Sequence, residues 1–200
     1  MQRTEQKQQT RQRVISAARN LFSEQGLAKT RTADIADRAG LSHGGVFVHF
    51  RTRDELLAEV VADIGRSITD RLHALIRDEA DIAAILQAHL DCLQEHESSY
   101  VSFLRESRLL PRDVLRTWVG IQSAISVHMA GPAEAAMKSG SIRSMPVHLL
   151  FNTWIGLVHH YLMNRELFAP KGSVLKRHGD ELLAHFLTMI SKERLQGEKK

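Results

Sequence analysis

The stretch of residues 30–53, TRTADIADRAGLSHGGVFVHFRTR, constrains the fold of this chain more than any other. Its first half predicts a short helix, because Ile35, Ala36 and Ala39 recur at the spacing of one helix face. Gly40 follows in the position where a helix C-cap prefers glycine. The pattern therefore predicts a helix that stops at residue 40 and a chain that turns there.

A second short helix is predicted directly after this turn. Thr30 and Thr32 are both candidates for the N-cap of the first helix. Ser42 can cap the second helix, which we expect over residues 43–50 with Val46 on its apolar face. Small residues where two helices cross, an apolar residue in the turn and a capped second helix predict a helix-turn-helix.

The surface of the second helix and the charge of the chain both indicate a DNA-binding head. The helix exposes His43, Gly45, Phe47 and His49 with little acidic charge, as a helix lying in a DNA groove requires. Residues 1–53 hold ten Lys/Arg against four Asp/Glu, a net charge of +6, whereas the other residues hold 17 against 19, a net charge of −2. Taken alone, this asymmetry is equally compatible with a solvated basic face.

The apolar patterning of the remaining sequence predicts an all-α protein. Residues 1–9 are polar and without periodicity, which indicates a flexible arm. Thr52 can cap a long helix that continues to about Arg77 and links a head to a body. Further helices are predicted over residues 10–25, 81–93, 98–110 (capped by Ser98 or Ser99 and ending before Pro111), 112–138 (kinked at Pro132), 146–168 and 174–195. The expected domains are 1–53, the arm and helix-turn-helix, and 54–200, a helical body.

The last two predicted helices indicate pairing of subunits. The helix that starts at Pro146 is apolar on more than one face, and the last helix adds a second apolar stripe. Two such neighbours are typical of a two-fold interface in which each subunit donates two helices to a four-helix bundle. We therefore expect a homodimer through these helices, although burial in the centre of one bundle explains the same pattern.

Composition argues against several other classes of protein. The single cysteine, Cys92, excludes an intramolecular disulfide and fits a reducing cytoplasm. No run of about 18 apolar residues suggests a membrane span, and the N-terminus lacks the apolar core of a secretory signal. The sequence shows no nucleophile with a nearby base, no paired acids and no phosphate loop, so nothing in it indicates an enzyme. We expect a cytoplasmic protein that is not an enzyme and holds no cofactor.

The head resembles that of the tetracycline-repressor (TetR) family of one-component bacterial transcription regulators. The matching residues are Ala17, Ala18, Leu21, Phe22, Gly26, Thr30, Ile35, Ala36, Ala39, Gly40, Leu41, Ser42, Gly44, Val46, Phe47, Phe50, Arg53, Leu56 and Leu57. The resemblance implies a three-helix DNA-binding head and a helical-bundle body for ligand binding and dimerisation. It further implies a regulator, in the first place a repressor, that binds a palindromic operator as a homodimer and is released by a small, mostly apolar effector.

Several positions depart from the family pattern. His43, Gly44 and Gly45 stand where the family often has Lys-Gly-Thr. Phe47 replaces a frequent phosphate-bonding Tyr, and Arg51 replaces a frequent Pro. Each glycine lowers helix propensity by about 1 kcal/mol relative to Ala, so this helix depends on its neighbour or on DNA for its shape. The departures leave open a helical protein-interaction adaptor that has lost operator recognition.

The predicted DNA contacts combine phosphate contacts, which position, with base contacts, which specify. Arg53 resembles the family's phosphate-contacting Lys, and Phe47 can rest on a thymine methyl. The full predicted set is Thr32, Ser42, His43, Gly44, Gly45, Phe47, His49 and Arg53. Arg3, Lys7 and Arg11 of the arm either follow the DNA or belong to a solvated tail.

The effector site is predicted among aromatic and polar residues of the body, because ligand pockets are apolar with a few convergent polar groups. The candidates are Tyr100, Phe103, Trp118, Gln122, His128, Phe151, Trp154 and His159, each of which plain core packing explains as well or better. Arg105 and Arg108 can anchor an anionic effector or lie on a helix surface. His89, Cys92 and His96 share a helix face that can hold Zn²⁺, but no further ligand accompanies them, so no metal is predicted.

Overall fold

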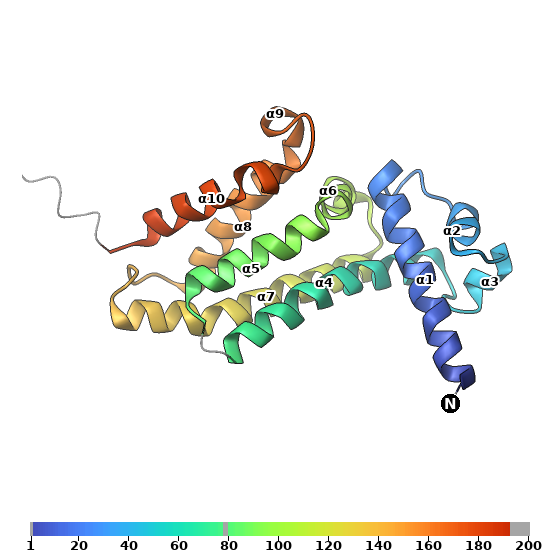
Figure 1. The fold of residues 1–200 in the computed structure, drawn as a ribbon, viewed down its shortest axis with the longest axis horizontal. Helices are drawn as coiled ribbons and strands as arrows, with labels where there is room; N and C mark the ends of the chain where they lie inside the picture. The colour runs from blue at the N-terminus through green and yellow to red at the C-terminus, as the bar shows by residue number, and fades with distance from the viewer. Residues whose placement is uncertain (1, 78–79, 193–200) are drawn as a thin grey trace, which may run out of the picture. The chain divides into compact units, whose positions relative to one another are not determined.

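The computed structural model describes residues 2–77 and 80–192, and these residues form helices without any strand (Figure 1). The helices are α1 (Gln2–Gln25), α2 (Thr32–Ala39), α3 (His43–Phe47), α4 (Arg53–Arg77), α5 (Ile82–Glu95), α6 (Glu97–Glu106), a 3₁₀ turn (Ser107–Leu109), α7 (Arg112–Ser139), α8 (Val147–Met163), α9 (Arg165–Phe168) and α10 (Val174–Ile190). One isolated antiparallel bridge joins Ile142 to Ser191. The predicted all-α fold is confirmed.

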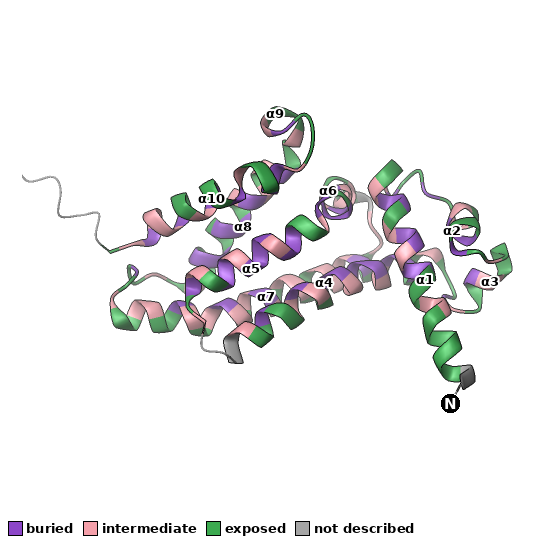
Figure 2. Cartoon of the chain, in the orientation of Figure 1, coloured by how far each residue is buried: buried purple, intermediate pink, exposed green. Residues whose placement is uncertain are grey.

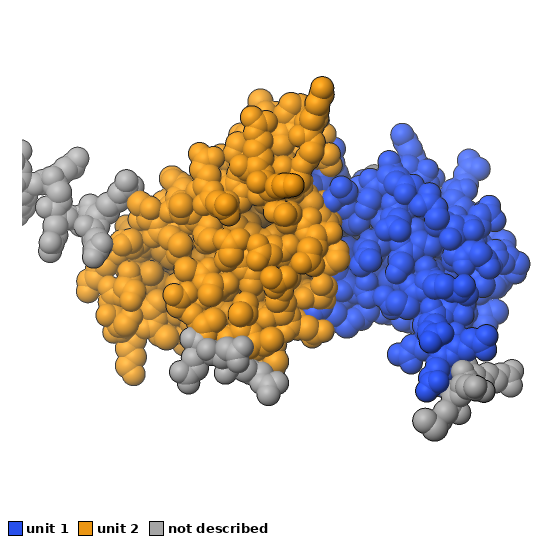
Figure 3. Space-filling model, viewed as in Figure 1, with its two compact units in different colours: residues 1–66, 98–121 blue, residues 67–97, 122–200 orange. Residues whose placement is uncertain are grey.

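The chain packs as two compact units (Figure 3). Unit 1 comprises the residues up to 66 together with residues 98–121, and unit 2 comprises residues 67–97 together with those from 122 onward. Helices α4 and α7 each contribute to both units, and α6 has its first residue in unit 2 and the others in unit 1. The boundary that we predict after residue 53 separates a DNA-binding domain from a helical body, whereas the two units are defined by packing. The predicted boundary stays a prediction.

The core of unit 1 joins the two short helices to their longer neighbours. Val14 and Phe22 of α1, Ile35 of α2, Val46 of α3 and Leu57 of α4 belong to one buried cluster. Burying a side chain of this size stabilises by about 1.5–3 kcal/mol. Helices as short as α2 and α3 are not stable alone, so this shared core holds them in place.

Helix α1 begins at Gln2, so the flexible arm predicted for residues 1–9 is wrong over residues 2–9. These residues include no Gly or Pro and are mostly Gln, Arg, Lys and Glu, which favour helix. The exposed turns extend the packed part of α1, so they need no separate nucleation (Figure 2). The predicted end of this helix is confirmed, because Gly26 follows it with a φ of +86°.

The N-terminus of α2 differs from both predicted caps. Arg31 is the N-cap, and its backbone N–H donates to the Asp34 carboxylate at 3.1 Å. Thr30 is buried, and its hydroxyl donates to the Gly26 carbonyl at 2.7 Å. Thr32 is the first helical residue. Thr30 therefore bonds back to Gly26, the residue that follows α1, and does not cap α2.

Other helix starts follow the predictions. The Thr52 hydroxyl accepts from the Glu55 N–H at 3.0 Å at the start of α4, and α4 ends at Arg77 as expected. The Asp81 carboxylate accepts from the Ala84 N–H at 2.8 Å at the start of α5. The predicted cap of α4 is therefore confirmed, and the helix predicted to begin at Asp81 is confirmed with Asp81 as its N-cap.

Three predicted helices differ in the second half of the chain. The helix predicted over residues 146–168 is divided at Asn164 into α8 and α9. Helix α6 begins at Glu97, so neither Ser98 nor Ser99 caps it. Helix α10 ends at Ile190 rather than at about residue 195, because the chain turns there into the bridge to Ile142. Residues 193–200, which include the predicted tail, lie outside the described residues.

The core of unit 2 is centred on Trp154 of α8, which is fully buried. Its ring lies 5.1 Å from that of Phe186 of α10, and its indole N–H donates to Nδ1 of His89 of α5 at 3.2 Å. Close packing of α10 on α5 occurs at Gly179, where a Cβ would lie 3.9 Å from Leu90 Cδ1. The three helices α5, α8 and α10 thus share one core.

Candidate functional site

The turn between α2 and α3 has the geometry that the sequence predicts. Gly40 adopts a left-handed conformation with φ of +67°, which few residues other than glycine adopt at low cost. Its N–H donates to the Asp37 carbonyl at 3.1 Å, and the Leu41 N–H donates to the Ala36 carbonyl at 2.9 Å. The Ser42 hydroxyl accepts from the Gly45 N–H at 3.2 Å and caps α3. The predicted C-cap and N-cap on the two sides of the turn are confirmed.

Helix α3 ends at Phe47, which is earlier than the predicted end at residue 50. Val48 and His49 form a turn, in which the His49 N–H donates to the Val46 carbonyl at 3.0 Å. The Phe50 N–H nevertheless donates to the Val46 carbonyl at 3.0 Å, as in an α-helix, and both residues are 1% exposed. The predicted apolar contact of α3 with the core is therefore confirmed, although the helix is shorter.

The exposed surface of the helix-turn-helix is apolar and aromatic. His43 and Gly44 are exposed, and the ring of His43 contacts that of Phe47 edge to face with centroids 5.2 Å apart. Phe47 is 40% exposed and Val48 is 69% exposed. Val48 is missing from the predicted set, and it lies in the turn that follows α3 rather than in the helix predicted to residue 50.

His49 lies in a different environment from His43 and Phe47. It is partly buried, and its Nδ1 atom makes no hydrogen bond within the described residues. Burial lowers the pKa of His49, and the positive charges of Lys7 and Arg11 lower that pKa further. The side chain therefore lies beside the basic surface of α1, and the structure does not bring it together with the exposed rings of α3.

The basic side chains of α1 are partly engaged within unit 1. The Arg11 guanidinium pairs with the Glu59 carboxylate at 2.8 Å and lies over the Phe50 ring at 4.8 Å. Arg11 and Arg66 hold the pKa of Glu59 below its usual range. Lys7 is exposed, and the Arg3 side chain lies outside the described residues.

Arg53 occupies the first turn of α4 and is only partly exposed. Its guanidinium donates to the carbonyls of Leu27 and Thr30 in the loop that precedes α2. Thr32 is partly buried at the start of α2. The predicted DNA-binding residues therefore divide into an exposed group on α3, a group at helix starts, and the partly buried Gly45 and His49.

Replacing Gly44 by alanine should raise the free energy of unfolding by about 0.5–1 kcal/mol, because alanine favours helix over glycine. Gly44 is helical and exposed, and no atom lies within 4 Å of the position that a Cβ would take. Urea unfolding followed by circular dichroism measures the change. Gly40→Ala is the control, since the space is equally open but φ is +67°, and it should destabilise by about 1 kcal/mol. Equal effects of the two substitutions would contradict the structure of this motif.

The predicted effector residues fall into both units. In unit 1, the Trp118 ring lies 4.7 Å from that of Phe103 and 5.3 Å from that of Tyr100. Phe103 also belongs to the buried core of unit 1, as the alternative of plain core packing expects. These three side chains form one aromatic cluster.

The other five candidates belong to unit 2. Trp154 and Phe151 are buried, and Gln122 has a buried amide nitrogen without a hydrogen bond in the described structure. Burial lowers the pKa of His159 to about 4, and burial together with His73 lowers that of His128. The role of all eight residues in effector binding stays a prediction.

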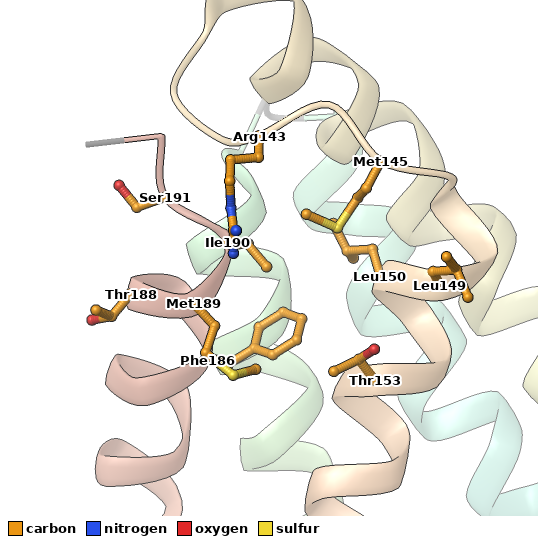
Figure 4. A pocket seen from close by; sticks show the side chains of 10 residues that line it. All are labelled: Arg143, Met145, Leu149, Leu150, Thr153, Phe186, Thr188, Met189, Ile190 and Ser191. Carbon is orange, nitrogen blue, oxygen red and sulfur yellow. The ribbon is translucent and has the colours of Figure 1, made fainter. Parts of the chain in front are cut away.

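Unit 2 also contains an apolar cavity of about 390 Å³ between α8 and the end of α10 (Figure 4). Its lining consists of Arg143, Met145, Leu149, Leu150, Thr153, Phe186, Thr188, Met189, Ile190 and Ser191, and it includes none of the eight predicted residues. Arg143 reaches the cavity from the loop before α8, which the Ile142–Ser191 bridge fixes against α10. No local sequence pattern predicts this cavity, because that bridge joins segments far apart in the chain.

His89, Cys92 and His96 have separate surroundings. His89 accepts a hydrogen bond from Trp154, and His96 bonds the Ser67 hydroxyl at 3.2 Å. Cys92 is buried, and its burial raises the pKa of the thiol. Among the residues that the structure describes, no group of three or more His, Cys, Asp or Glu is arranged to hold a metal ion.

Comparison with known proteins identifies the class of the head. Residues 14–60 match the family described as bacterial regulatory proteins, tetR family. Over 61 residues the chain is 43% identical to the HTH-type transcriptional repressor Rv3405c of Mycobacterium tuberculosis (strain ATCC 25618 / H37Rv), a region that covers 30% of this chain and 32% of that protein. Over 147 residues it is 25% identical to the HTH-type transcriptional repressor KstR2 of Rhodococcus jostii (strain RHA1), covering 70% of this chain and 72% of that protein.

Solved structures extend the similarity to the whole fold. FadR from Bacillus subtilis, in complex with stearoyl-CoA, has a TM-score of 0.75 at 17% identity and covers 90% of this chain and 98% of that chain. KstR2 of Mycobacterium tuberculosis has a TM-score of 0.71 at 20% identity, with coverages of 92% and 95%. The head of the chain, over residues 14–60, therefore matches the TetR family of bacterial regulatory proteins, and the solved structures show the same fold for the rest. With Rv3405c the match spans only about a third of either protein, so what the whole chain binds is a separate question.

Among the described helices, none combines the length and the apolar character that crossing a membrane requires.

Proposed function

We propose that this protein is a one-component transcriptional regulator that binds a palindromic operator as a homodimer. Repression is the mode of regulation that we favour. The observation that carries the proposal is the capped helix-turn-helix with its exposed face of His43, Gly44, Phe47 and Val48. The sequence has no acidic residue between Asp37 and Asp54, so this face carries no carboxylate. Such a face can enter a negatively charged groove. Relatives over this region are described as transcriptional repressors.

Five of the predicted contacts have a chemical role in this proposal. His43 can bond the edge of a base, and Phe47 can rest on a thymine methyl with Val48 beside it. Gly45 lets the backbone of α3 come close to the DNA. Ser42 and Thr32 can offer hydroxyls to phosphates, and these contacts set the register of the head on the duplex.

Selection of binding sites from a pool of random duplexes tests the proposal. The enriched sequence should be an inverted repeat whose half-sites lie about one helical turn apart, about 34 Å, or a simple multiple of that spacing. The logarithm of its affinity should fall linearly with the logarithm of the salt concentration, because bound Lys and Arg displace counterions. If no inverted repeat is enriched, or if the protein binds the enriched repeat no better than random DNA at moderate salt, the proposal of operator binding is contradicted.

Dimerisation is proposed through α8 and α10. Leu149 and Met163 of α8 are 52% and 39% exposed, although large apolar side chains are usually buried or covered by a partner. Gly156 and Thr153 are exposed on the same helix. A two-fold axis beside this face would let both subunits cover it with the same residues.

Leu149→Glu should therefore shift the protein from dimer toward monomer, since two carboxylates would be buried across the two-fold axis. Sedimentation equilibrium should show at least a tenfold weaker dimer, which corresponds to about 1.4 kcal/mol. Val127→Glu on α7 is the matched control, because Val127 is an aliphatic residue that is 72% exposed. Dimers of equal strength in both variants would place the interface elsewhere.

The effector in this proposal is a small, mostly apolar molecule bound in the body. The solved structure of FadR from Bacillus subtilis holds stearoyl-CoA, and KstR2 of Mycobacterium tuberculosis is described as a ketosteroid transcriptional regulator. The aromatic cluster of unit 1, the predicted residues of unit 2 and the cavity at Arg143 are the three candidate regions of this chain. Separate alanine substitutions at Trp118, Trp154 and Arg143 distinguish them in a binding titration.

Release from DNA follows if the effector binds one conformation better than the other. We propose that it shifts α4, the long helix that links the head to the body, and thereby changes the distance between the two copies of α3. The coupling equals the difference in effector affinity between the two states. A ligand that binds tightly but leaves operator affinity unchanged would contradict this mechanism.

A protein-interaction adaptor is the second candidate function. The exposed side chains of Phe47 and Val48 favour it, because exposed apolar side chains are also typical of protein interfaces. Salt-dependent binding to one inverted repeat distinguishes the regulator from the adaptor, for which no DNA sequence is preferred.

A further inference from the structure

The loop between α1 and α2 is held from two sides within unit 1. Glu106, the last residue of α6, accepts hydrogen bonds from the Leu27 N–H at 2.9 Å and from the Ala28 N–H at 2.7 Å, one with each carboxylate oxygen. On the other side, the Arg53 guanidinium donates to the carbonyl of Leu27 and to that of Thr30. Hydrogen bonds to charged groups are roughly twice as strong as neutral ones, so the loop is firmly held.

The conformation of the loop matches the position of this carboxylate. Gly26 has a φ of +86°, and a Cβ at that position would lie 2.7 Å from Oε1 of Glu106. The Gly26 carbonyl in turn accepts the hydroxyl of Thr30. Glycine is therefore required here both for its conformation and for the space that Glu106 occupies.

Helix α6 is also fixed to α1 at another point. The Ser99 hydroxyl lies 2.5 Å from that of Ser23 and 3.3 Å from the Arg19 carbonyl. Because α6 is anchored to α1 through Ser99, its last residue holds the loop at a defined position. The loop leads directly into Arg31, the N-cap of α2.

We propose that Glu106 is a positioning residue for operator recognition, which together with Arg53 orients α2 and α3 by fixing the loop before α2. This role rests on the proposed function. Glu106 does not touch DNA, because a carboxylate repels phosphate; it acts through the N–H groups of Leu27 and Ala28. It lies about 60 residues after the helix-turn-helix in the sequence, so no motif of the head includes it.

The sign of the effect separates positioning from electrostatics. Removing a negative charge from a DNA-binding protein should strengthen DNA binding through long-range electrostatics alone. Loss of the clamp should instead weaken binding to the operator, because the exposed face of α3 would no longer be presented in one orientation. Glu106→Gln therefore gives opposite results under the two explanations.

The experiment compares two duplexes: the inverted repeat that the wild-type protein enriches from a random pool, and a scrambled duplex of the same composition. Glu106→Gln should lower affinity for the inverted repeat about tenfold, which is within the range that one mismatched base pair causes. It should not weaken binding to the scrambled duplex, and the salt slope should stay the same because no phosphate contact is lost. Asp54→Asn is the matched control, since it removes the same charge from an exposed side chain that forms no hydrogen bond or ion pair in the described structure. It should bind both duplexes at least as tightly as the wild type.

Two further measurements keep the test decisive if Glu106→Gln folds poorly. Glu106→Asp keeps the charge but shortens the reach by one methylene, so it should also lose affinity for the inverted repeat. Hydrogen exchange should show faster exchange at the Leu27 and Ala28 amides in both variants. Wild-type affinity of folded Glu106→Gln or Glu106→Asp for the inverted repeat overturns the role of Glu106 and leaves the proposed function standing. If the wild type enriches no inverted repeat, the proposed function fails, and the positioning role fails with it.

Discussion

Lowering the pH from 7 to 5 should reduce the free energy of unfolding of unit 2 by about 4 kcal/mol, because two of its histidines stay neutral in the folded protein. Burial lowers the pKa of His89 to about 3 and that of His159 to about 4. His89 is fully buried, its Nδ1 accepts from the Trp154 indole, and its Nε2 makes no hydrogen bond within the described residues. A charge on either imidazole would therefore be poorly solvated.

The direction follows from proton binding in the two states. In the unfolded chain both histidines have an ordinary pKa of about 6.5, so below that pH the unfolded state binds up to two more protons than the folded state. Stability therefore falls as the pH drops from about 6.5 toward the folded pKa values of about 4 and about 3. Each histidine contributes up to about 1.4 kcal/mol per pH unit in this window.

His89→Gln should remove about half of this loss, because glutamine does not titrate and its amide oxygen can still accept the Trp154 indole N–H. Urea unfolding of the wild type and the variant at a series of pH values between 8 and 5 measures the slope. The comparison at pH 8 isolates the packing effect, since both imidazoles are neutral there in either state. Identical slopes for the two proteins between pH 6.5 and 5 would contradict the assigned burial of His89.

Gly65→Ala should destabilise unit 1 by about 1–3 kcal/mol, because a Cβ cannot be accommodated where α4 crosses α7. A Cβ at residue 65 would lie 2.4 Å from Cγ1 and 2.5 Å from Cδ1 of Ile121. Isoleucine is branched at Cβ and has few rotamers, so it cannot move aside without a shift of the helix. Thermal and urea unfolding should both show the loss.

The companion substitutions make this prediction specific. Ile121→Ala should largely suppress the effect of Gly65→Ala, so the double-mutant cycle should give a coupling of at least about 1 kcal/mol. Gly120→Ala is the control on α7, since residue 120 is exposed and its Cβ would meet nothing within 4 Å. A Gly65→Ala variant as stable as the Gly120→Ala variant would contradict the close crossing of α4 and α7.

The local features of the head could be predicted from the sequence because they depend on neighbouring residues. The spacing of Ile35, Ala36 and Ala39 defines one helix face, Gly40 supplies the left-handed turn, and Ser42 caps the next helix. Each of these features needs only a few consecutive residues. All of them are confirmed.

Features that depend on tertiary contacts could not be predicted in this way. Thr30 looked like a cap, but its hydroxyl bonds the Gly26 carbonyl inside unit 1. His49 looked like part of the exposed face of α3, but it is partly buried beside the basic side chains of α1. The bond of Thr30 is itself local and replaces the predicted cap, whereas for His49 a distant segment decides the surroundings of the side chain.

The candidate site shows the same difference. Resemblance to the family implies a phosphate contact for Arg53, whereas the structure shows its guanidinium bonded to the carbonyls of the loop before α2. Glu106 holds the same loop from 79 residues away along the chain, and no local pattern signals that contact. The cavity at Arg143 likewise needs the bridge between Ile142 and Ser191.

The central claim, that two copies of this head bind one palindrome together, is tested most directly by changing the spacing of its half-sites. Inserting about 5 base pairs at the centre of the enriched inverted repeat rotates one half-site by about half a turn while leaving both half-site sequences intact. A dimer with fixed spacing between its two copies of α3 should then bind no more tightly than it binds a duplex with a single half-site. Affinity equal to that for the original repeat would show that the heads bind independently, and it would contradict the proposal of a dimeric regulator.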